Sequence, residues 1–97
     1  MTPEPILDPS SIDFTQLIAD RDGLRRSNPQ RFEMEQVDAV VLIDSTNHII
    51  VGYKDIGPEE FWCKGHMPDF PLMPGVLMCE AAAQLVSYYI IHIGALK

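Results

Sequence analysis

The sequence has few basic residues and few cysteines, and each scarcity excludes a class of function. Seven lysines and arginines stand against 14 aspartates and glutamates, which gives a net charge of -7. We therefore expect no nucleic acid and no membrane among its partners. The two cysteines, Cys63 and Cys79, fit neither a zinc-site spacing nor a disulfide framework. They predict buried, reduced thiols, a cytoplasmic location and no metal site.

The N-terminus lacks a basic segment followed by an apolar core, so the sequence predicts no signal peptide. Residues 76–96 are apolar enough to raise the question of a membrane span, but four polar residues interrupt them: Glu80, Gln84, Ser87 and His92. We interpret this segment as a buried core helix. A hydrophobic content of 46% over 97 residues is typical of one globular domain.

Charge is distributed unevenly along the chain. Residues 21–31 contain four arginines (Arg21, Arg25, Arg26 and Arg31) and one acidic residue, Asp22. Residues 33–60 hold seven acidic residues against one lysine, Lys54. The arginine cluster predicts either a docking patch for an acidic partner or an ordinary solvated surface.

Local patterns divide the single domain, residues 1–97, into four parts. Residues 1–30 form a proline-rich lead-in followed by a short helix, expected over residues 11–21. Two β-branched runs around a polar turn predict an antiparallel hairpin over residues 37–56. A stiff loop follows over residues 65–75, and a long helix over residues 75–93.

The predicted helix is apolar on nearly every face, and such a helix must be buried on all sides. Its polar line is narrow and consists of Glu80, Gln84 and Ser87, which share one side because they are four and three positions apart. One hairpin and one short helix are too little to surround it. We therefore expect the domain to be incomplete at its C-terminus, with the missing sheet supplied by a longer natural chain or by a partner.

His66 is the first candidate for chemistry. It follows Gly65 and opens a segment with three prolines at every third position, which stiffen the path of the loop. An imidazole titrates near neutral pH, so it is suited to accept a proton there. We expect His66 to act as a general base, although a lone histidine is more often structural.

Glu80 is the second candidate, because an acid inside an apolar helix is costly unless it is paired or kept neutral. Burial favours the protonated form of a carboxyl group, which makes it a proton donor. Gln84, one turn further along, is expected to hydrogen-bond to this acid. The other interpretation is an acid that faces solvent near the helix N-terminus.

The start of the helix offers free backbone donors at Gly75 and Val76, which are able to form an oxyanion hole. The bland alternative is an uncapped, solvated helix end. Four further side chains are expected to line an apolar substrate channel or to pack in the core: Phe61, Trp62, Met67 and Phe70.

The central motif reads Gly65-His66-Met67-Pro68-Asp69-Phe70-Pro71-Leu72-Met73-Pro74-Gly75-Val76, and it is followed by Glu80-Ala81-Ala82-Ala83-Gln84. It resembles the (3R)-hydroxyacyl-(acyl carrier protein) dehydratases of the FabZ type. Their pattern is Gly-His-Phe-Pro-x-x-Pro-x-x-Pro-Gly-Val, then Glu-Ala-x-Ala-Gln. Met67 is the one change at a fixed position. A weaker likeness extends back to residues 29–38, where Gln30, Glu33 and Met34 depart from the family pattern.

The resemblance implies an α+β hot-dog fold, in which an antiparallel sheet wraps one long central helix. It implies a homodimer, or an oligomer of dimers, in which His66 of one chain faces Glu80 of the other. It implies a hydro-lyase of fatty-acid biosynthesis that converts 3-hydroxyacyl thioesters to trans-2-enoyl thioesters. The substrate rides on the phosphopantetheine arm of an acidic acyl carrier protein, and the enzyme needs no cofactor.

Glu80 and Gly65 favour simple dehydration, since the related dehydratase/isomerases have Asp and Cys at these positions. Two other functions stay open from the sequence. One is a non-catalytic or partner-dependent hot-dog subunit, and the other is an acyl-thioesterase on the same fold.

Overall fold

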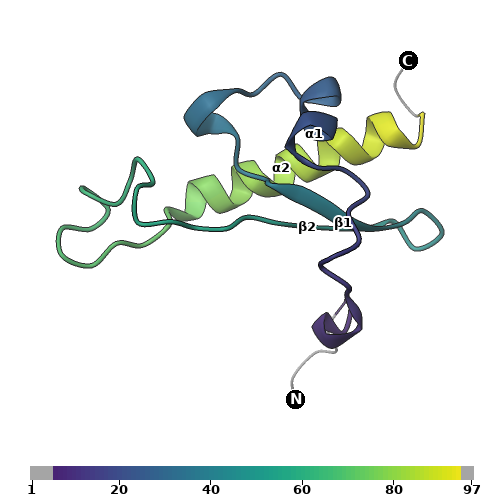
Figure 1. Ribbon diagram of the computed structural model, residues 1–97, viewed down its shortest axis with the longest axis horizontal. Helices are drawn as coiled ribbons and strands as arrows, with labels where there is room; N and C mark the ends of the chain where they lie inside the picture. The colour runs from purple at the N-terminus through teal and green to yellow at the C-terminus, as the bar shows by residue number, and fades with distance from the viewer. Residues whose placement is uncertain (1–5, 95–97) are drawn as a thin grey trace.

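A computed structural model describes residues 6–94 of the chain. The chain forms an α+β unit in which a two-stranded antiparallel sheet lies against one long helix (Figure 1). In chain order the elements are η1 (3-10 helix, Pro9–Ser11), α1 (Arg21–Ser27), η2 (3-10 helix, Phe32–Met34), β1 (Ala39–Asp44), β2 (Ile49–Tyr53) and α2 (Gly75–His92).

The hairpin expected over residues 37–56 is present as β1 and β2. Its turn is closed by Asp44, whose Oδ1 accepts the N–H groups of Thr46 at 3.1 Å and Asn47 at 3.2 Å. The register shifts between Val40 and Leu42, so β1 contains a bulge. The polar turn residues thus set the hairpin where the β-branched runs predicted it.

The helix predicted over residues 11–21 is wrong. Asp13 accepts the N–H of Thr15 at 2.9 Å and so forms a local turn instead. Ile18 and Ala19 then run alongside β1, where the Ile18 N–H donates to the Val40 carbonyl oxygen at 2.8 Å. The helix begins only after Asp20.

Helix α1 begins there because Asp20 is its N-cap and accepts the N–H of Gly23 at 2.9 Å. The spacing that suggested a helix belongs instead to an extended arm, in which Ala19 is buried while Leu17 and Ile18 are about half exposed. Sequence periodicity alone does not separate these two cases over so short a segment.

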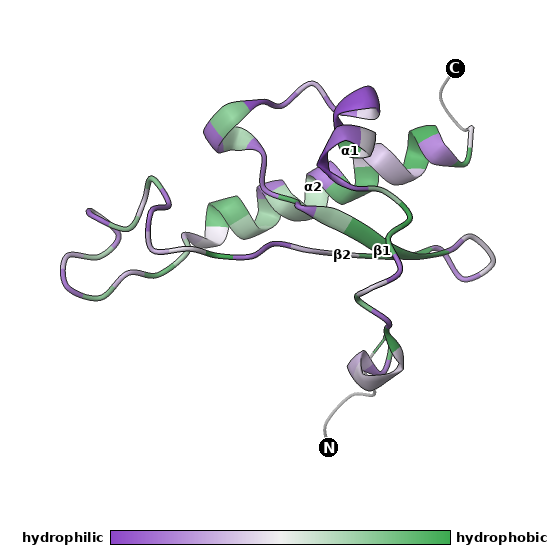
Figure 2. Ribbon diagram, viewed as in Figure 1, coloured by the Kyte–Doolittle hydropathy of each residue, from purple (hydrophilic) through white to green (hydrophobic). Residues whose placement is uncertain are grey.

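The core lies between the sheet, α1 and α2. Its buried members come from all of these layers: Ala19, Leu24, Val37, Val40 and Tyr88. Figure 2 shows the strands and α2 as the apolar elements and α1 as a largely polar one. Gly52 allows α2 to approach β2 closely, because a Cβ there would lie 2.7 Å from both the Ala39 carbonyl oxygen and Leu85 Cδ2.

Among the described residues, the sheet and α1 do not surround helix α2, so its expected burial on all sides stays a prediction. Its buried positions form one stripe, Leu77, Gln84 and Tyr88. Val76 is 77% exposed, and Cys79 is exposed although we expected buried thiols. The sheet and α1 cover one side of the helix only. Within residues 6–94, no helix combines the length and hydropathy that a membrane crossing requires.

Candidate active site

The loop between β2 and α2 projects beyond the end of the sheet and carries His66 (Figure 1). Its prolines have no N–H to donate, so other residues close its turns. The Met67 N–H donates to the Phe70 carbonyl oxygen at 3.0 Å, and the Phe70 N–H donates back at 2.9 Å. Asp69 turns the tip with a φ of 64°, a region that Asp adopts more readily than most residues. These bonds define the shape of the loop tip.

His66 is held at both its backbone and its ring. The Leu72 N–H donates to the His66 carbonyl oxygen at 2.7 Å, and the Nδ1 of His66 lies 3.0 Å from the Leu72 carbonyl oxygen. A carbonyl oxygen only accepts hydrogen bonds, so Nδ1 carries the proton of this bond. In the neutral ring the lone pair is then on Nε2. This is the tautomer that a general base needs.

Glu80 lies in the second turn of α2 and is half-buried. The Nε2 of Gln84 donates to Glu80 Oε1 at 3.2 Å, which is the contact expected between residues four positions apart. The amide therefore restrains the carboxyl group from the side of the helix C-terminus.

Gln84 is also tied to a distant segment, which the sequence did not indicate. Its Oε1 accepts the Gln36 N–H at 3.0 Å, and its Nε2 donates to the Met34 carbonyl oxygen at 2.7 Å. Gln84 is 3% exposed. One side chain thus links Glu80 to the backbone that leads into β1. No local pattern reveals such a link, because the partners are about 50 positions apart in the sequence.

The first turn of α2 has no side-chain cap. The Pro74 carbonyl oxygen accepts the N–H groups of Leu77 at 3.0 Å and Met78 at 3.2 Å. Among the described residues, the N–H groups of Gly75 and Val76 have no hydrogen-bond acceptor. Both residues are exposed, and a Cβ at Gly75 would meet nothing within 4 Å. An oxygen with developing negative charge is able to approach this end of the helix.

The structure does not join His66 and Glu80 by a hydrogen bond within the part of the chain that it describes. The ring of His66 bonds to its own loop, and the carboxyl group of Glu80 bonds to Gln84 on α2. The same residues contain no group of three His, Cys, Asp or Glu side chains that could hold a metal ion.

Comparison with known proteins decides the family. The sequence profile of the FabA-like domain matches residues 28–97. The chain belongs to the FabA-like family. The resemblance noted from the motif around His66 is thereby confirmed, as is the α+β hot-dog class. The match begins after α1, so the arm and α1 lie outside the matched part of this FabA-like chain.

Curated relatives carry dehydratase names. The chain is 45% identical over 62 residues to the 3-hydroxyacyl-acyl-carrier-protein dehydratase FabZ of Acinetobacter baylyi, covering 64% of this chain and 40% of the relative. It is 36% identical over 75 residues to the enzyme of the same name from Thermoanaerobacter sp., covering 77% of this chain and 52% of the relative. The chain thus spans about half or less of the length of these relatives.

The four predicted channel residues of this FabA-like chain lie in different surroundings. Trp62 is buried, whereas Phe61, Met67 and Phe70 are each at least half exposed. Phe61 packs edge-on against Trp62, with 5.4 Å between ring centroids. Three of the four side chains are thus open to solvent, and their role in binding an acyl chain stays a prediction.

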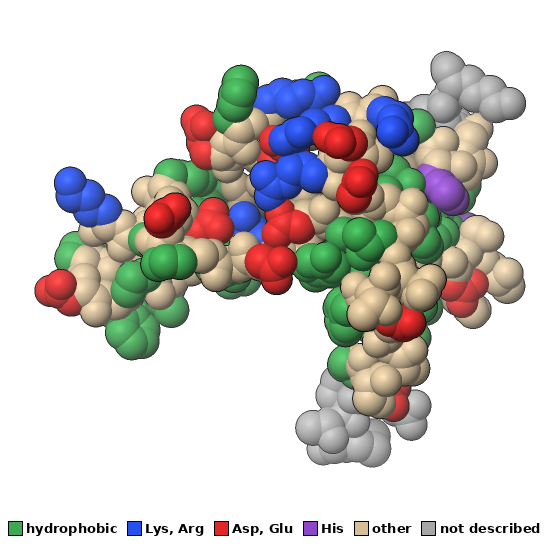
Figure 3. All heavy atoms as spheres, in the orientation of Figure 1, with side chains coloured by type: hydrophobic (Ala, Val, Ile, Leu, Met, Phe, Trp, Pro, Cys, Tyr) green, Lys and Arg blue, Asp and Glu red, His purple; other side chains and the backbone are tan. Residues whose placement is uncertain are grey.

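The arginine cluster is largely paired within the chain. Arg21 forms an ion pair with Asp38, and Arg25 makes a bidentate pair with Glu35 at 2.7 and 2.8 Å. Figure 3 shows acidic side chains directly beside the basic ones over α1. Hydrogen bonds from Arg25 hold the pKa of Glu35 below its ordinary value, against the opposing effect of burial. Much of the positive charge of this cluster is therefore neutralised.

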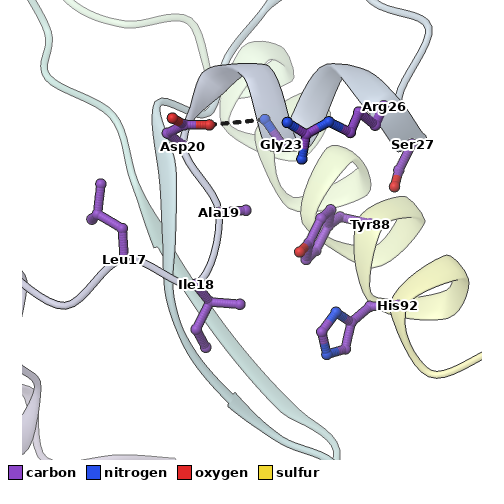
Figure 4. Close-up of a pocket in the computed structure, with 9 residues that line it drawn as sticks. All are labelled: Leu17, Ile18, Ala19, Asp20, Gly23, Arg26, Ser27, Tyr88 and His92. Carbon is purple, nitrogen blue, oxygen red and sulfur yellow. Dashed lines mark hydrogen bonds between the residues drawn. The ribbon is translucent and has the colours of Figure 1, made fainter.

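Arg31 uses its guanidinium on the backbone, donating to the Asn28 and Gln30 carbonyl oxygens at 2.7 Å each. Arg26 is exposed, and among the described residues its guanidinium makes no ion pair. It lines an open pocket of about 470 Å³ together with Leu17, Ile18, Ala19, Asp20, Gly23, Ser27, Tyr88 and His92 (Figure 4). The pocket lies at the C-terminal part of α2 and contains neither His66 nor Glu80.

Proposed function

We propose that this chain provides the catalytic pair of a 3-hydroxyacyl-thioester dehydratase of fatty-acid biosynthesis. The observation that carries the proposal is the hydrogen bond from His66 Nδ1 to the Leu72 carbonyl oxygen at 3.0 Å, since it leaves Nε2 to accept a proton. The dehydratase names of the relatives support the same reaction.

In the proposed reaction, His66 Nε2 removes a proton from C2 of the acyl chain. Glu80 protonates the hydroxyl at C3 as the C3–O bond breaks, so one water leaves and a trans-2,3 double bond forms. The N–H groups of Gly75 and Val76 stabilise the negative charge on the thioester oxygen. No step requires a cofactor, and the balance closes when His66 returns its proton to Glu80 directly or through water.

We propose that the active site is shared between two copies of the chain. His66 and Glu80 each bond within their own element, and the exposed first turn of α2 leaves room for a second chain. A two-fold dimer would bring His66 of one chain to Glu80 of the other and would repeat the site twice.

The acyl group is proposed to arrive on the phosphopantetheine arm of an acidic acyl carrier protein in the cytoplasm. Arg26 is the arginine of the cluster best placed to meet such a partner. Arg21 and Arg25 are already paired with acids, and Arg31 with backbone carbonyls.

The proposal is tested by incubating the purified protein with a 3-hydroxyacyl-carrier thioester and following the enoyl product. Conversion that disappears in His66→Ala and in Glu80→Gln supports it. Release of free thiol without enoyl product would replace it with a thioesterase. No turnover of either kind by the unaltered protein would favour a non-catalytic subunit.

A further inference from the structure

Lys54, the residue after β2, is unusually well buried for a lysine. Its side chain is 11% exposed, and its Nζ lies 3.3 Å from Glu60 Oε1. The same Nζ lies 5.7 Å from the centre of the Trp62 ring. Withdrawing an ammonium group from water is costly unless it is compensated, and here a carboxylate and an aromatic face both compensate it.

Glu60 is fixed in turn by the backbone of the loop. Its Oε2 accepts the N–H of Gly57 at 3.2 Å. The carboxylate therefore joins the start of the loop to the end of β2, rather than extending into solvent.

Trp62 connects this cluster to His66. It is 5% exposed and is the one buried residue between positions 54 and 74. Its carbonyl oxygen accepts the N–H of Gly65 at 3.1 Å and the N–H of His66 at 2.7 Å. The residue whose ring lies under Lys54 thus holds the backbone of the candidate base.

Few other polar contacts locate this loop. Among the described residues, every hydrogen bond made by residues 57–72 stays within that segment. Among the described polar contacts, the ion pair between Glu60 and Lys54 is the one that connects this segment to a residue outside it. One ion pair and one buried ring thus fasten the loop that carries His66 to the end of the sheet.

We infer that Lys54, Glu60 and Trp62 form a clamp that positions His66, and that they are positioning residues of the reaction. This inference rests on the proposed function for its catalytic consequence, while the clamp itself is a matter of structure. It also assigns Trp62 to anchoring the loop in place of lining a channel. Because Lys54 is so little exposed, its charge serves the loop and not a docking partner.

The test compares Lys54→Met with Lys64→Met in the otherwise unaltered protein. Both changes remove one lysine charge near the same loop, but Lys64 is exposed and has no described ion pair. Two further variants are Lys54→Arg and Glu60→Gln. Lys54→Arg keeps a positive charge over Trp62, whereas Glu60→Gln removes only the charge of the ion pair.

The first measurement does not depend on activity. Trp62 is the one tryptophan of the sequence, so acrylamide quenching of its fluorescence reports on the clamp. We expect quenching and hydrogen exchange of the His66 amide to increase in Lys54→Met and Glu60→Gln. We expect both to stay unchanged in Lys64→Met and nearly unchanged in Lys54→Arg. Equal quenching and exchange in Lys54→Met and Lys64→Met would overturn the clamp.

The second measurement is the steady-state kinetics of dehydration. Loss of positioning predicts a kcat reduced about tenfold or more in Lys54→Met with KM changed by less than about twofold, since a misplaced base acts on the chemical step. A kcat of Lys54→Met equal to that of Lys64→Met would overturn the positioning role. An inactive unaltered protein with an intact quenching difference would instead refute the proposed function and leave the clamp supported.

Discussion

The ring nitrogen Nδ1 of His66 lies 3.0 Å from the carbonyl oxygen of Leu72, six residues further along the same loop. The backbone of the two residues is joined as well, since the Leu72 N–H donates to the His66 carbonyl oxygen at 2.7 Å. The loop therefore fixes the direction of the imidazole and its tautomer from within. The regularly spaced prolines around His66 stiffen the loop, and the Leu72 carbonyl oxygen determines which ring nitrogen of His66 carries the proton.

The tautomer is the first prediction. In two-bond ¹H–¹⁵N spectra at a pH where the ring is neutral, His66 is expected to show Nδ1 protonated and Nε2 unprotonated. His92, whose ring has no hydrogen bond among the described residues, provides the reference in the same spectrum, and His66→Ala assigns the signal. An Nε2-protonated His66 would remove the lone pair on which the mechanism depends.

Gly75 provides a clean test of the backbone donors at the helix start. It is the first residue of α2, and Pro74 before it has ψ 138°, which suits a following proline. Gly75→Pro therefore deletes the N–H and keeps the helix, whereas Gly75→Ala keeps both. We expect kcat/KM to fall about 10²-fold in Gly75→Pro and little in Gly75→Ala. Equal rates in the two variants, with equal helical circular dichroism, would assign the oxyanion to another donor.

Gln84 is predicted to contribute strongly to stability. Gln84→Leu leaves the buried Gln36 N–H and the partly buried Met34 carbonyl oxygen without their partners. We expect the free energy of unfolding to fall by about 2–5 kcal/mol, since each unsatisfied buried group costs about 1–3 kcal/mol. Urea denaturation measures this. Gln16→Leu, at an exposed position, should change it by less than about 0.5 kcal/mol. Similar losses in both variants would contradict the buried link.

The pair between Arg25 and Glu35 predicts how stability depends on pH. Hydrogen bonds from Arg25 lower the pKa of Glu35 below its ordinary value of 4.5. The folded state thus binds fewer protons than the unfolded state in this range. The contribution of Glu35 is therefore present above pH 4.5 and is lost as the pH falls through the folded pKa.

Denaturation between pH 7 and pH 3 checks this expectation. Glu35→Gln should be less stable than the unaltered protein at pH 7, and the difference should shrink below pH 4.5. Glu33→Gln, at an exposed neighbouring position, is the matched control. A difference between Glu35→Gln and the unaltered protein that is constant over the whole range would show that Glu35 does not titrate with folding.

Local chemistry made some elements predictable from the sequence. The β-branched runs and the Asp44 turn indicated the hairpin, and the alanine-rich segment indicated α2 to within one residue at its C-terminal end. The motif around His66 indicated the family. The placement of Gln84 beside Glu80 followed from helix periodicity alone, because residues four apart share one face.

Other features depend on partners far away in the sequence. Ile18 and Ala19 are extended because Val40 accepts their N–H groups, which overrides their helical spacing. The link from Gln84 to Met34 joins residues 50 positions apart. The contact between Lys54 and Trp62 is closer in the sequence, but it joins a strand end to a loop and follows no local pattern either. Hydropathy indicates that α2 is able to be buried on every face, but it does not tell which elements lie against the helix.

The central claim is that His66 and Glu80 act together across two chains, and mixing two inactive variants tests it most directly. His66→Ala and Glu80→Gln should each reduce dehydration by about 10²-fold or more. In a two-fold dimer that combines them, one site keeps both wild-type residues, while the other has neither. Co-expression should therefore restore about a quarter of the unaltered activity for random pairing. Mixed dimers that form but remain as inactive as the separate variants would contradict the shared site.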